Sequence, residues 1–450
     1  MVSSSDIKAA IQNLLSNDDP GLRYHSAWWL GKMKIKEASP ALCQCLSEDT
    51  EQTSLGGYPL RRQAARSLGM IKEKEAVDPL LDALNSHDPR LQEASILALK
   101  AIGDRKATEG LINFLQKDLP QKPHEALIET LAALEAWSIR DLIEPYLNDG
   151  SERIKGAAAV YLFCLTRDES FLEPLLVNLR HHNPFIRQSS AFDLAQCKYP
   201  RLHVSISEAE LPNNVKLAAL KQILETYELE VTKQSDGCLD LTVKNLLEAI
   251  DLLMPNAVEG NLPTTSFLTN DAHSSSNLRE NLEQLLSCLR NSNSSEQLRA
   301  IERLIILGRN DIAIIIQALD ECVDEDIRAG LVQVIYELAD PQTIKSLQDV
   351  IGLDIANHCQ GKLRRVSILA LGRIYTKTQF EEDKHSIFTT LNWALNEPDD
   401  WGLRYSSVMA WENLMIESKA SKKPFDDLDF QQELPVVRLR IKQAIAKIYP

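Results

Sequence analysis

A chain of 450 residues is long for one globular core, so several domains or one long repeat array is expected. The formal net charge of −15 argues against a general nucleic-acid or anionic-membrane partner, because either would need a mainly basic surface. Residues 1–8 are polar, and the longest apolar stretch is far too short to cross a bilayer, so we expect neither a secretory signal nor a membrane span.

A ten-residue phrase recurs along the chain with the period of a helix. It reads LRYHSAWWLG at residues 22–31, LRRQAARSLG at 60–69 and LRRVSILALG at 363–372. An apolar residue is followed by a basic one, by a small residue four positions on and by Leu eight positions on, which predicts an amphipathic helix. Dipeptides such as Asp19-Pro20 and Asp88-Pro89 precede several copies and are typical of helix starts. Weaker copies begin at Leu91, Ile154, Ile186, Val215, Ile327 and Leu403.

A second amphipathic segment follows the phrase, so each repeat is a pair of helices. The basic residue recurs after 38 positions from Arg23 to Arg61 and after 36 from Arg328 to Arg364. Pairs of this length stack so that each buries its apolar face on its neighbours. The sequence therefore predicts an all-α fold, a helical-repeat superhelix with a concave binding face.

The pattern breaks in residues 253–277, which contain Pro255, Gly260 and Pro263 and a polar run at 273–277. We interpret this stretch as a linker between an N-terminal repeat domain, residues 1–252, and a C-terminal one, residues 278–450. The string Gly-Leu-Arg-Tyr occurs at 21–24 and again at 402–405, which suggests related end elements. An insertion at 47–58 predicts a loop that hangs over one face.

The recurring basic residue is expected to serve the fold. We predict that it forms a ladder of bonds to acidic side chains and backbone carbonyls of adjacent repeats, and so does not contact a ligand. The ladder comprises Arg23, Arg61, Lys155, Arg187, Arg328, Arg364 and Arg404.

Phrase positions 3 and 7 are expected to face the groove. Of the adjacent Trp28 and Trp29, Trp29 falls on the core side, whereas Trp28 either lines the groove or packs under the Gly56-Gly57 loop. The resulting mixture of rings, guanidinium groups and a carboxylate suits an extended conjugated ligand that carries carboxylates. The predicted groove residues are Tyr24, Trp28, Arg62, Arg66, Glu93, Arg365 and Tyr405.

Residues 23–31 and 61–69 together closely resemble the opening of the E/F-type phycobilin lyases, which are cyanobacterial HEAT-like repeat proteins. Residues 400–405 resemble the C-terminal repeat of that family, and the resemblance covers nearly the whole chain as fused E-like and F-like halves. It implies a lyase that attaches phycoerythrobilin by a thioether to a cysteine of a phycoerythrin subunit, with alpha the expected one. The eight scattered cysteines separately predict reduced thiols and therefore a cytoplasmic location. The bilin is the substrate, and no permanently bound cofactor is implied.

Residues 357–362, Asn-His-Cys-Gln-Gly-Lys, resemble the Asn-His-Cys-Gln-Gly-Asn motif of the F subunit of a lyase that also isomerises its bilin. The resemblance implies that His358 and Cys359 are catalytic and convert phycoerythrobilin into phycourobilin. A His can move protons near neutral pH, and a thiol can add transiently to an electrophilic carbon. Lys362 departs from the motif, and the alternative is that His358-Cys359 merely ends a helix.

The resemblance also suggests roles for the groove residues. Arg62, Arg66 and Arg365 would hold the propionates, and Glu93 would bond the pyrrole N–H groups. The rings of Tyr24, Trp28 and Tyr405 would stack on the tetrapyrrole. The lyase would hold the bilin in one protonated conformation and present ring A to the acceptor thiolate.

Other functions remain open on the residues alone. Repeat superhelices are often non-catalytic scaffolds, and a scaffold or chaperone for phycobiliprotein assembly is the main alternative. A di-iron hydroxylase needs several His-Glu pairs, but only His124-Glu125 occurs, and Cys43-x-Cys45 lacks a second pair at zinc-finger spacing. We therefore expect no metal site. The acidic balance argues against a DNA-base enzyme.

Overall fold

The computed structural model describes residues 3–16, 18–49, 52–119, 121–231, 239–256, 276–290, 294–352, 361–397, 400–418, 424–425, 428 and 433–449. Throughout these residues the regular structure is helical and contains no strand. This confirms the predicted all-α repeat fold. The chain divides into two compact units, residues 1–197 and 198–450.

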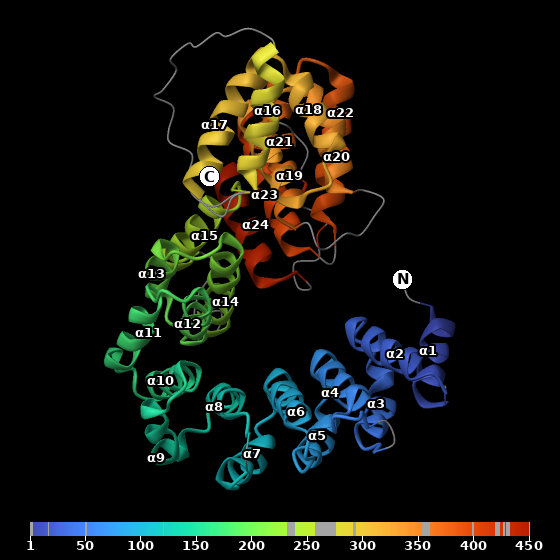
Figure 1. Cartoon of the computed structure of the whole chain (residues 1–450), viewed down its shortest axis with the longest axis vertical. Coiled ribbons are helices and arrows are strands. Elements are labelled where there is room, and N and C mark those ends of the chain that lie inside the picture. The colour runs from blue at the N-terminus through green and yellow to red at the C-terminus, as the bar shows by residue number, and fades with distance from the viewer. Residues whose placement is uncertain are drawn as a thin grey trace. The chain divides into compact units, whose positions relative to one another are not determined.

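The first unit consists of two layers of helices, and Figure 1 shows the inner layer on the concave side of its arc. Successive inner helices pack side by side, and so do the outer helices α3, α5 and α7. The inner helices are α2 (Pro20–Lys32), α4 (Pro59–Ile71), α6 (Pro89–Ile102), α8 (His124–Ala133), α10 (Glu152–Thr166) and α12 (Pro184–Gln196). The outer helices are α1 (Ser4–Ser16), α3 (Ser39–Leu46), α5 (Val77–Ala83), α7 (Ala107–Gln116), α9 (Arg140–Ile143) and α11 (Glu173–Asn178).

The inner helices begin as the sequence predicts. Asp19, Asp88 and Asn183 each cap a helix by accepting a hydrogen bond from the backbone N–H two residues on, and proline follows directly. These caps satisfy an N–H group that would otherwise lack a partner at the start of the helix. The phrase therefore starts its helix where the Asp-Pro or Asn-Pro dipeptide lies.

The basic ladder is confirmed at Arg23 and Arg61, whereas Lys155 pairs with Glu152 on its own helix α10. Arg23 Nε donates to the carbonyl of Leu14 at 2.8 Å, and Arg61 Nε donates to that of Leu46 at 2.7 Å. Each guanidinium also pairs with an acidic side chain, Glu48 for Arg23 and Asp49 for Arg61. Because the last carbonyls of a helix have no partner within it, this arginine ties each inner helix to the end of the preceding outer one.

The glycine that ends the phrase allows neighbouring inner helices to approach closely. A Cβ placed on Gly31 would lie 2.5 Å from the Cβ of Ser67, and one on Gly69 would lie 2.9 Å from the Cα of Ala98. Ser67 also donates its hydroxyl to the carbonyl of Ala27 at 2.7 Å. The small residues of the phrase are therefore explained by the spacing between repeats.

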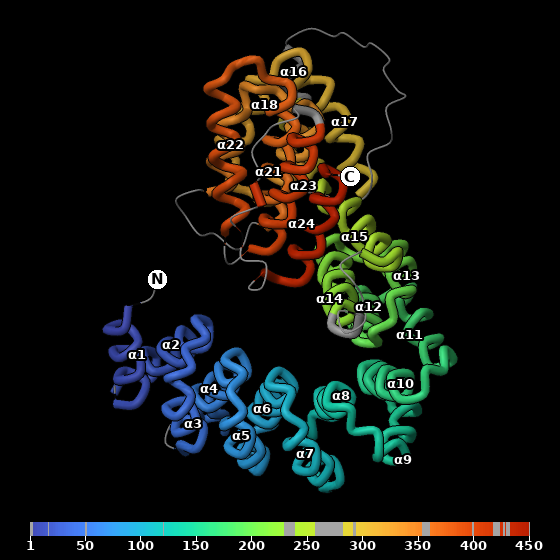
Figure 2. Tube along the Cα trace, turned by 180° about the vertical axis from the view of Figure 1, so that it is seen from behind, coloured from blue at the N-terminus to red at the C-terminus, as the bar shows by residue number. Residues whose placement is uncertain are grey.

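The second unit continues the same pairing in a row of packed helices that ends with α21, α23 and α24, seen from behind in Figure 2. Helices α14 and α15 pack against α24. Its helices are α13 (His203–Glu208), α14 (Asn213–Val231), α15 (Leu241–Leu253), α16 (Ser276–Leu289), α17 (Ser294–Asn310), α18 (Ile312–Glu321), α19 (Glu325–Leu338), α20 (Ile344–Ile351), α21 (Gly361–Lys377), α22 (Glu381–Leu395), α23 (Trp401–Ser418) and α24 (Pro435–Ile448).

These contacts place residues 198–252, which we assigned to the N-terminal domain, in the second compact unit. Ion pairs that each have one buried member join residues 198–252 to α24, with Arg438 bound to Glu228 and Arg440 bound to Asp251. The ten-residue phrase could not reveal this division, because it describes contacts between consecutive repeats and not the packing of α24 on helices far earlier in the chain. Most of the predicted linker, residues 257–275, lies outside the described residues.

Candidate functional site

The inner face of the first unit presents a row of side chains from three adjacent helices. Trp28 on α2 is 42% exposed, and Arg66 on α4 and Glu93 on α6 are also exposed. Tyr24 lies half-buried one turn before Trp28. We call Tyr24, Trp28, Arg66 and Glu93 the inner row. It combines two rings, a guanidinium and a carboxylate, as the register of the phrase predicts.

The two adjacent tryptophans have different environments. Trp29 is partly buried and packs against the core of the first unit, as predicted. The exposed ring of Trp28 has the ammonium of Lys32 5.3 Å from its centroid, a distance at which a cation is attracted to the face of an aromatic ring. Trp28 therefore presents an accessible aromatic surface beside a positive charge.

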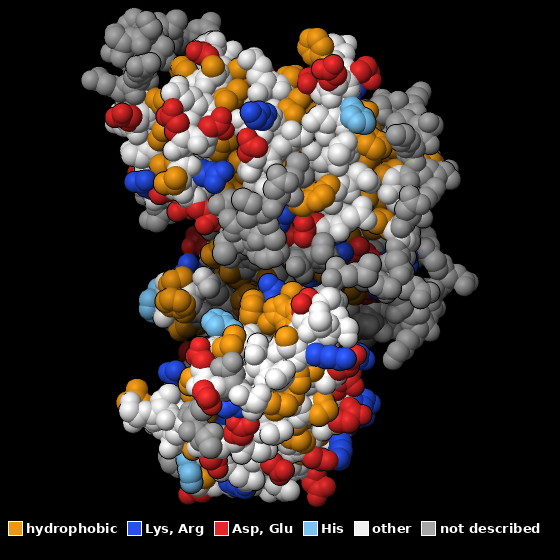
Figure 3. Space-filling view, turned by 90° about the vertical axis from the view of Figure 1, so that its right-hand side faces the viewer, with side chains coloured by type: hydrophobic (Ala, Val, Ile, Leu, Met, Phe, Trp, Pro, Cys, Tyr) orange, Lys and Arg blue, Asp and Glu red, His pale blue; other side chains and the backbone are white. Residues whose placement is uncertain are grey.

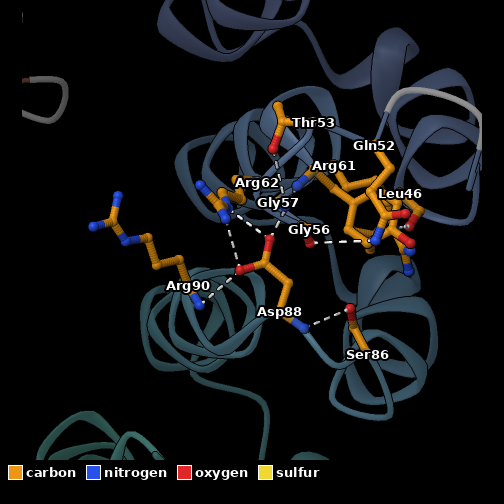
Figure 4. Close-up of polar contacts among 11 residues, drawn as sticks. Leu46, Gln52, Thr53, Gly56, Gly57, Arg61, Arg62, Ser86, Asp88 and Arg90 are labelled. Atoms are coloured by element: carbon orange, nitrogen blue, oxygen red, sulfur yellow. Dashed lines mark hydrogen bonds and ion pairs between the residues drawn. The ribbon is translucent and has the colours of Figure 1, made fainter.

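The prediction that Arg62 holds a propionate is wrong, because its guanidinium is already paired within the protein. Its Nε and Nη2 donate to the two carboxylate oxygens of Asp88 at 2.7 and 2.8 Å, as Figure 4 shows. The guanidinium also packs against Gly57, where a Cβ would lie 2.4 Å from Nη2. Arg62, rather than Trp28, is therefore the side chain that packs under the Gly56-Gly57 loop.

Asp88 is the reason why Arg62 turns toward the next repeat. Its carboxylate also accepts hydrogen bonds from the backbone N–H groups of Tyr58 and Arg90. Burial alone would raise the pKa of Asp88, but the hydrogen bonds from Arg62 and Tyr58 hold that pKa below its usual value. One buried carboxylate thus caps α6, anchors the loop and occupies Arg62.

We expect the Arg62→Ala variant to lower the free energy of unfolding by about 1–3 kcal/mol, because it leaves the buried Asp88 carboxylate without its strongest donor. Arg66→Ala, an exposed change one turn further along α4, is the control and should change stability by no more than about 0.5 kcal/mol. Chemical denaturation followed by circular dichroism measures both. Equal losses for the two variants would contradict the structural role of Arg62.

Arg365 and Tyr405 are also wrong as groove residues, because both are buried inside the second unit. Arg365 donates to the carbonyls of Met254 and Asn256, each at 3.3 Å, and burial lowers its pKa to about 10. The hydroxyl of Tyr405 donates to Asp251 at 2.8 Å. Their phrase position faces away from the repeat core as expected, but α15 and the residues after it cover that position in this unit.

His358 and Cys359 lie outside the described residues, so their role stays a prediction. Other candidates can be placed. Glu125 forms an ion pair with Arg153, and the ring of His124 lies 5.2 Å from that of Tyr146. Across the described residues, no group of three or more His, Cys, Asp or Glu side chains is arranged to hold a metal ion.

A mixed-charge cluster on α6, α8, α10 and α12 was not predicted from the sequence. Lys100 binds Glu129 at 2.8 Å and Gln196 at 2.8 Å, and the Arg153–Glu125 pair lies on the same helices. A signal was present, because Lys100 occupies the phrase position that holds glycine in residues 22–31 and 60–69. The departure of Lys100 from the repeat pattern is therefore the sequence feature that indicates this cluster.

The face of the molecule drawn in Figure 3 mixes the two signs of charge. Acidic, basic and hydrophobic side chains intersperse over the coloured residues in Figure 3. None of the helices in the described ranges is long and apolar enough to cross a membrane.

Comparison with known proteins identifies the repeats. The family model for HEAT repeats matches residues 58–132, and the model for the PBS lyase HEAT-like repeat matches residues 22–48. A solved complex of CpcE and CpcF of phycocyanin lyase from Nostoc sp. contains a similar chain, with 32% identity and a TM-score of 0.49, covering 56% of this chain and 95% of that one.

Two curated relatives align over nearly their full length. Bilin biosynthesis protein PecE of Mastigocladus laminosus is 46% identical over an alignment of 248 residues, which covers 53% of this chain and 92% of the relative. Phycocyanobilin lyase subunit alpha of Picosynechococcus sp. is 33% identical over an alignment of 267 residues, which covers 56% of this chain and 98% of the relative. The remainder of this chain lies outside these matches, so its F-like character stays a prediction. The chain belongs to the bilin lyase family that includes PecE and the alpha subunits of phycocyanobilin lyase.

Proposed function

We propose that this chain attaches phycoerythrobilin to a cysteine of a phycoerythrin subunit. In the reaction the acceptor thiol adds across the ring A ethylidene double bond, so that a C–S bond forms at the ethylidene carbon and the thiol proton passes to the conjugated system. The observation that supports this most is the family membership combined with the inner row. Two relatives whose names refer to bilin synthesis or attachment align along nearly their whole length, and Trp28 is exposed on the inner helices.

The inner row suits an open-chain tetrapyrrole. The rings of Tyr24 and Trp28 offer a stacking surface, and the exposed guanidinium of Arg66 can form paired hydrogen bonds with a propionate. Glu93 can accept hydrogen bonds from pyrrole N–H groups. A free bilin adopts many conformations, so holding it in one of them lowers the entropic cost of reaching the transition state. We place this reaction in the cytoplasm, where the acceptor thiol stays reduced.

Attachment can be tested by producing the chain in a bacterium together with an enzyme pathway for phycoerythrobilin and one phycoerythrin subunit at a time. We expect one subunit to become covalently coloured, so that its zinc-enhanced fluorescence persists on a denaturing gel. A parallel culture that makes phycocyanobilin tests the choice of bilin. A soluble acceptor that stays colourless in the presence of bilin would contradict the proposal and favour a non-catalytic scaffold.

The colour of the product tests the second activity. We propose that His358 and Cys359 isomerise the bilin to phycourobilin, which shifts the absorption of the coloured subunit from green toward blue-green. The His358→Ala and Cys359→Ala variants should then retain attachment and lose the shift. A product of unshifted colour from the unmodified chain would remove the isomerase and leave the lyase intact.

A further inference from the structure

A buried carboxylate lies where the inner helices α10 and α12 meet. Asp193 is 3% exposed and packs against Gly156, where a Cβ would lie 2.6 Å from Oδ2. Two contacts place charged side chains near it: Gly156 lies one turn after Arg153 on α10, and Gln196, three residues after Asp193 on α12, accepts a hydrogen bond from Lys100. Aspartates are rarely buried to this extent without a role, so Asp193 needs an explanation beyond packing.

The charged groups around Asp193 come from three other inner helices. Lys100 on α6 and Glu129 on α8 form one ion pair, while Glu125 on α8 and Arg153 on α10 form another. The side chain of Glu129 is 12% exposed and that of Arg153 is 43% exposed, so part of the cluster is accessible from solvent. We call Lys100, Glu125, Glu129 and Arg153 the charged cluster. It offers both signs of charge to one ligand.

The pKa of Asp193 lies near neutral pH. Burial raises its pKa to about 7, the attraction of Arg153 and Lys100 opposes the rise, and repulsion from Glu129 and Glu125 adds to it. Cys197, at the end of the same helix, remains a neutral thiol because burial raises its pKa well above the usual value. A positive ligand above the cluster would therefore favour the anionic form of Asp193, by attraction between opposite charges in a poorly solvated place.

A protonated bilin has the complementary chemistry, since it carries a cationic set of pyrrole N–H groups and two anionic propionates on one molecule. Accepting oxygens on Glu129 and Glu125 suit the N–H groups, and the exposed guanidinium of Arg153 suits a propionate. A mixed cluster of this kind fits a zwitterionic ligand better than a simple anion or a metal ion.

We propose that the bilin extends from the inner row to the charged cluster, which binds further pyrrole N–H groups and the second propionate, and that Asp193 is a positioning residue whose negative charge keeps the bound bilin protonated. This inference rests on the proposed function. Asp193 acts through its electric field, from beneath the groups that touch the ligand, and it takes its charge by releasing a proton to solvent when the cation binds. The bilin then stays protonated to a higher pH than it would above a neutral side chain.

The test uses the full-length chain with phycoerythrobilin, whose neutral and protonated forms differ in absorption maximum. The absorption of the bound bilin is followed as a function of pH for the unmodified chain and for Asp193→Asn, which has the same shape without the charge. We expect the midpoint of the transition to fall by about one pH unit or more in the variant. Glu129→Gln should lower the midpoint as well, and the exposed Asp141→Asn on the outer helix α9 should leave it unchanged.

The outcomes separate the two proposals. If the unmodified chain binds the bilin and the midpoint is the same in Asp193→Asn and Glu129→Gln, the inference about the charged cluster is overturned while the lyase proposal stands. If the unmodified chain does not bind phycoerythrobilin, the proposed function fails and this inference fails with it. Thermal melting of each variant shows whether it is folded before its titration is interpreted.

Discussion

Replacing Arg440 by methionine is expected to lower the free energy of unfolding of the second unit by about 3–5 kcal/mol. Arg440 is 2% exposed, and its guanidinium binds Asp251 at 2.9 Å and also pairs with Glu412. Methionine fills a similar volume but leaves both carboxylates without their shared partner. Removing one member of a buried ion pair costs far more than the pair itself contributes, because the remaining charge stays in a poorly solvated place.

Urea denaturation followed by circular dichroism measures this loss. The control is Lys442→Met, an exposed change on the same helix α24, which should alter stability by no more than about 0.5 kcal/mol. Comparable losses in the two variants would show that the Arg440 network does not hold α24 to α15. A large loss for Arg440 alone supports the packing of residues 198–256 with the C-terminal helices.

Asp193→Asn is expected to stabilise the protein at pH 8 by about 2–4 kcal/mol and to have little effect near pH 4. The carboxyl of Asp193 has a pKa of about 7 in the folded chain, against about 4 for an ordinary aspartate in an unfolded chain. Below pH 4 both states are protonated and the group is neutral to stability. As pH rises toward 7 the unfolded state ionises first, so the wild-type protein loses stability, and above pH 7 the loss stays constant.

The difference between the two proteins is measured by denaturation at several pH values, because every other titrating group is common to both. We expect the difference to grow between pH 4 and 7 and then to level off. A difference that does not change with pH would show that Asp193 has an ordinary pKa, and would weaken the case for its charge acting on a ligand.

Most of the fold could be predicted because the determinants are local. Asp19 and Pro20 start a helix through contacts within one turn, and Arg23 contacts only neighbouring helical segments, at the carbonyl of Leu14 and at Glu48. The boundary between the compact units depends instead on contacts such as Arg440 with Asp251, which are 189 residues apart. A repeat pattern contains no information about pairs so distant in sequence.

The candidate site shows the same limit. Register correctly indicated that Trp28, Arg66 and Glu93 point away from the repeat core. It could not show that Arg365 and Tyr405 are covered, because other helices of the second unit supply the cover. The repeat pattern also could not predict the direction of the Arg62 side chain. Arg62 has the same register as Tyr24, but its guanidinium binds Asp88.

The central claim is that the inner row of the first unit binds the bilin, and a binding titration tests it most directly. Phycoerythrobilin is titrated into the full chain, into a Trp28→Ala plus Arg66→Ala variant and into Val177→Ala, an exposed change on the outer helix α11. The double variant loses the ring that stacks on the bilin and the guanidinium that binds its propionate. Its dissociation constant for the bilin should therefore rise at least about tenfold, equivalent to about 1.4 kcal/mol. Val177→Ala should bind as the unmodified chain does. Equal affinity in all three proteins would contradict the claim that the bilin binds on this face.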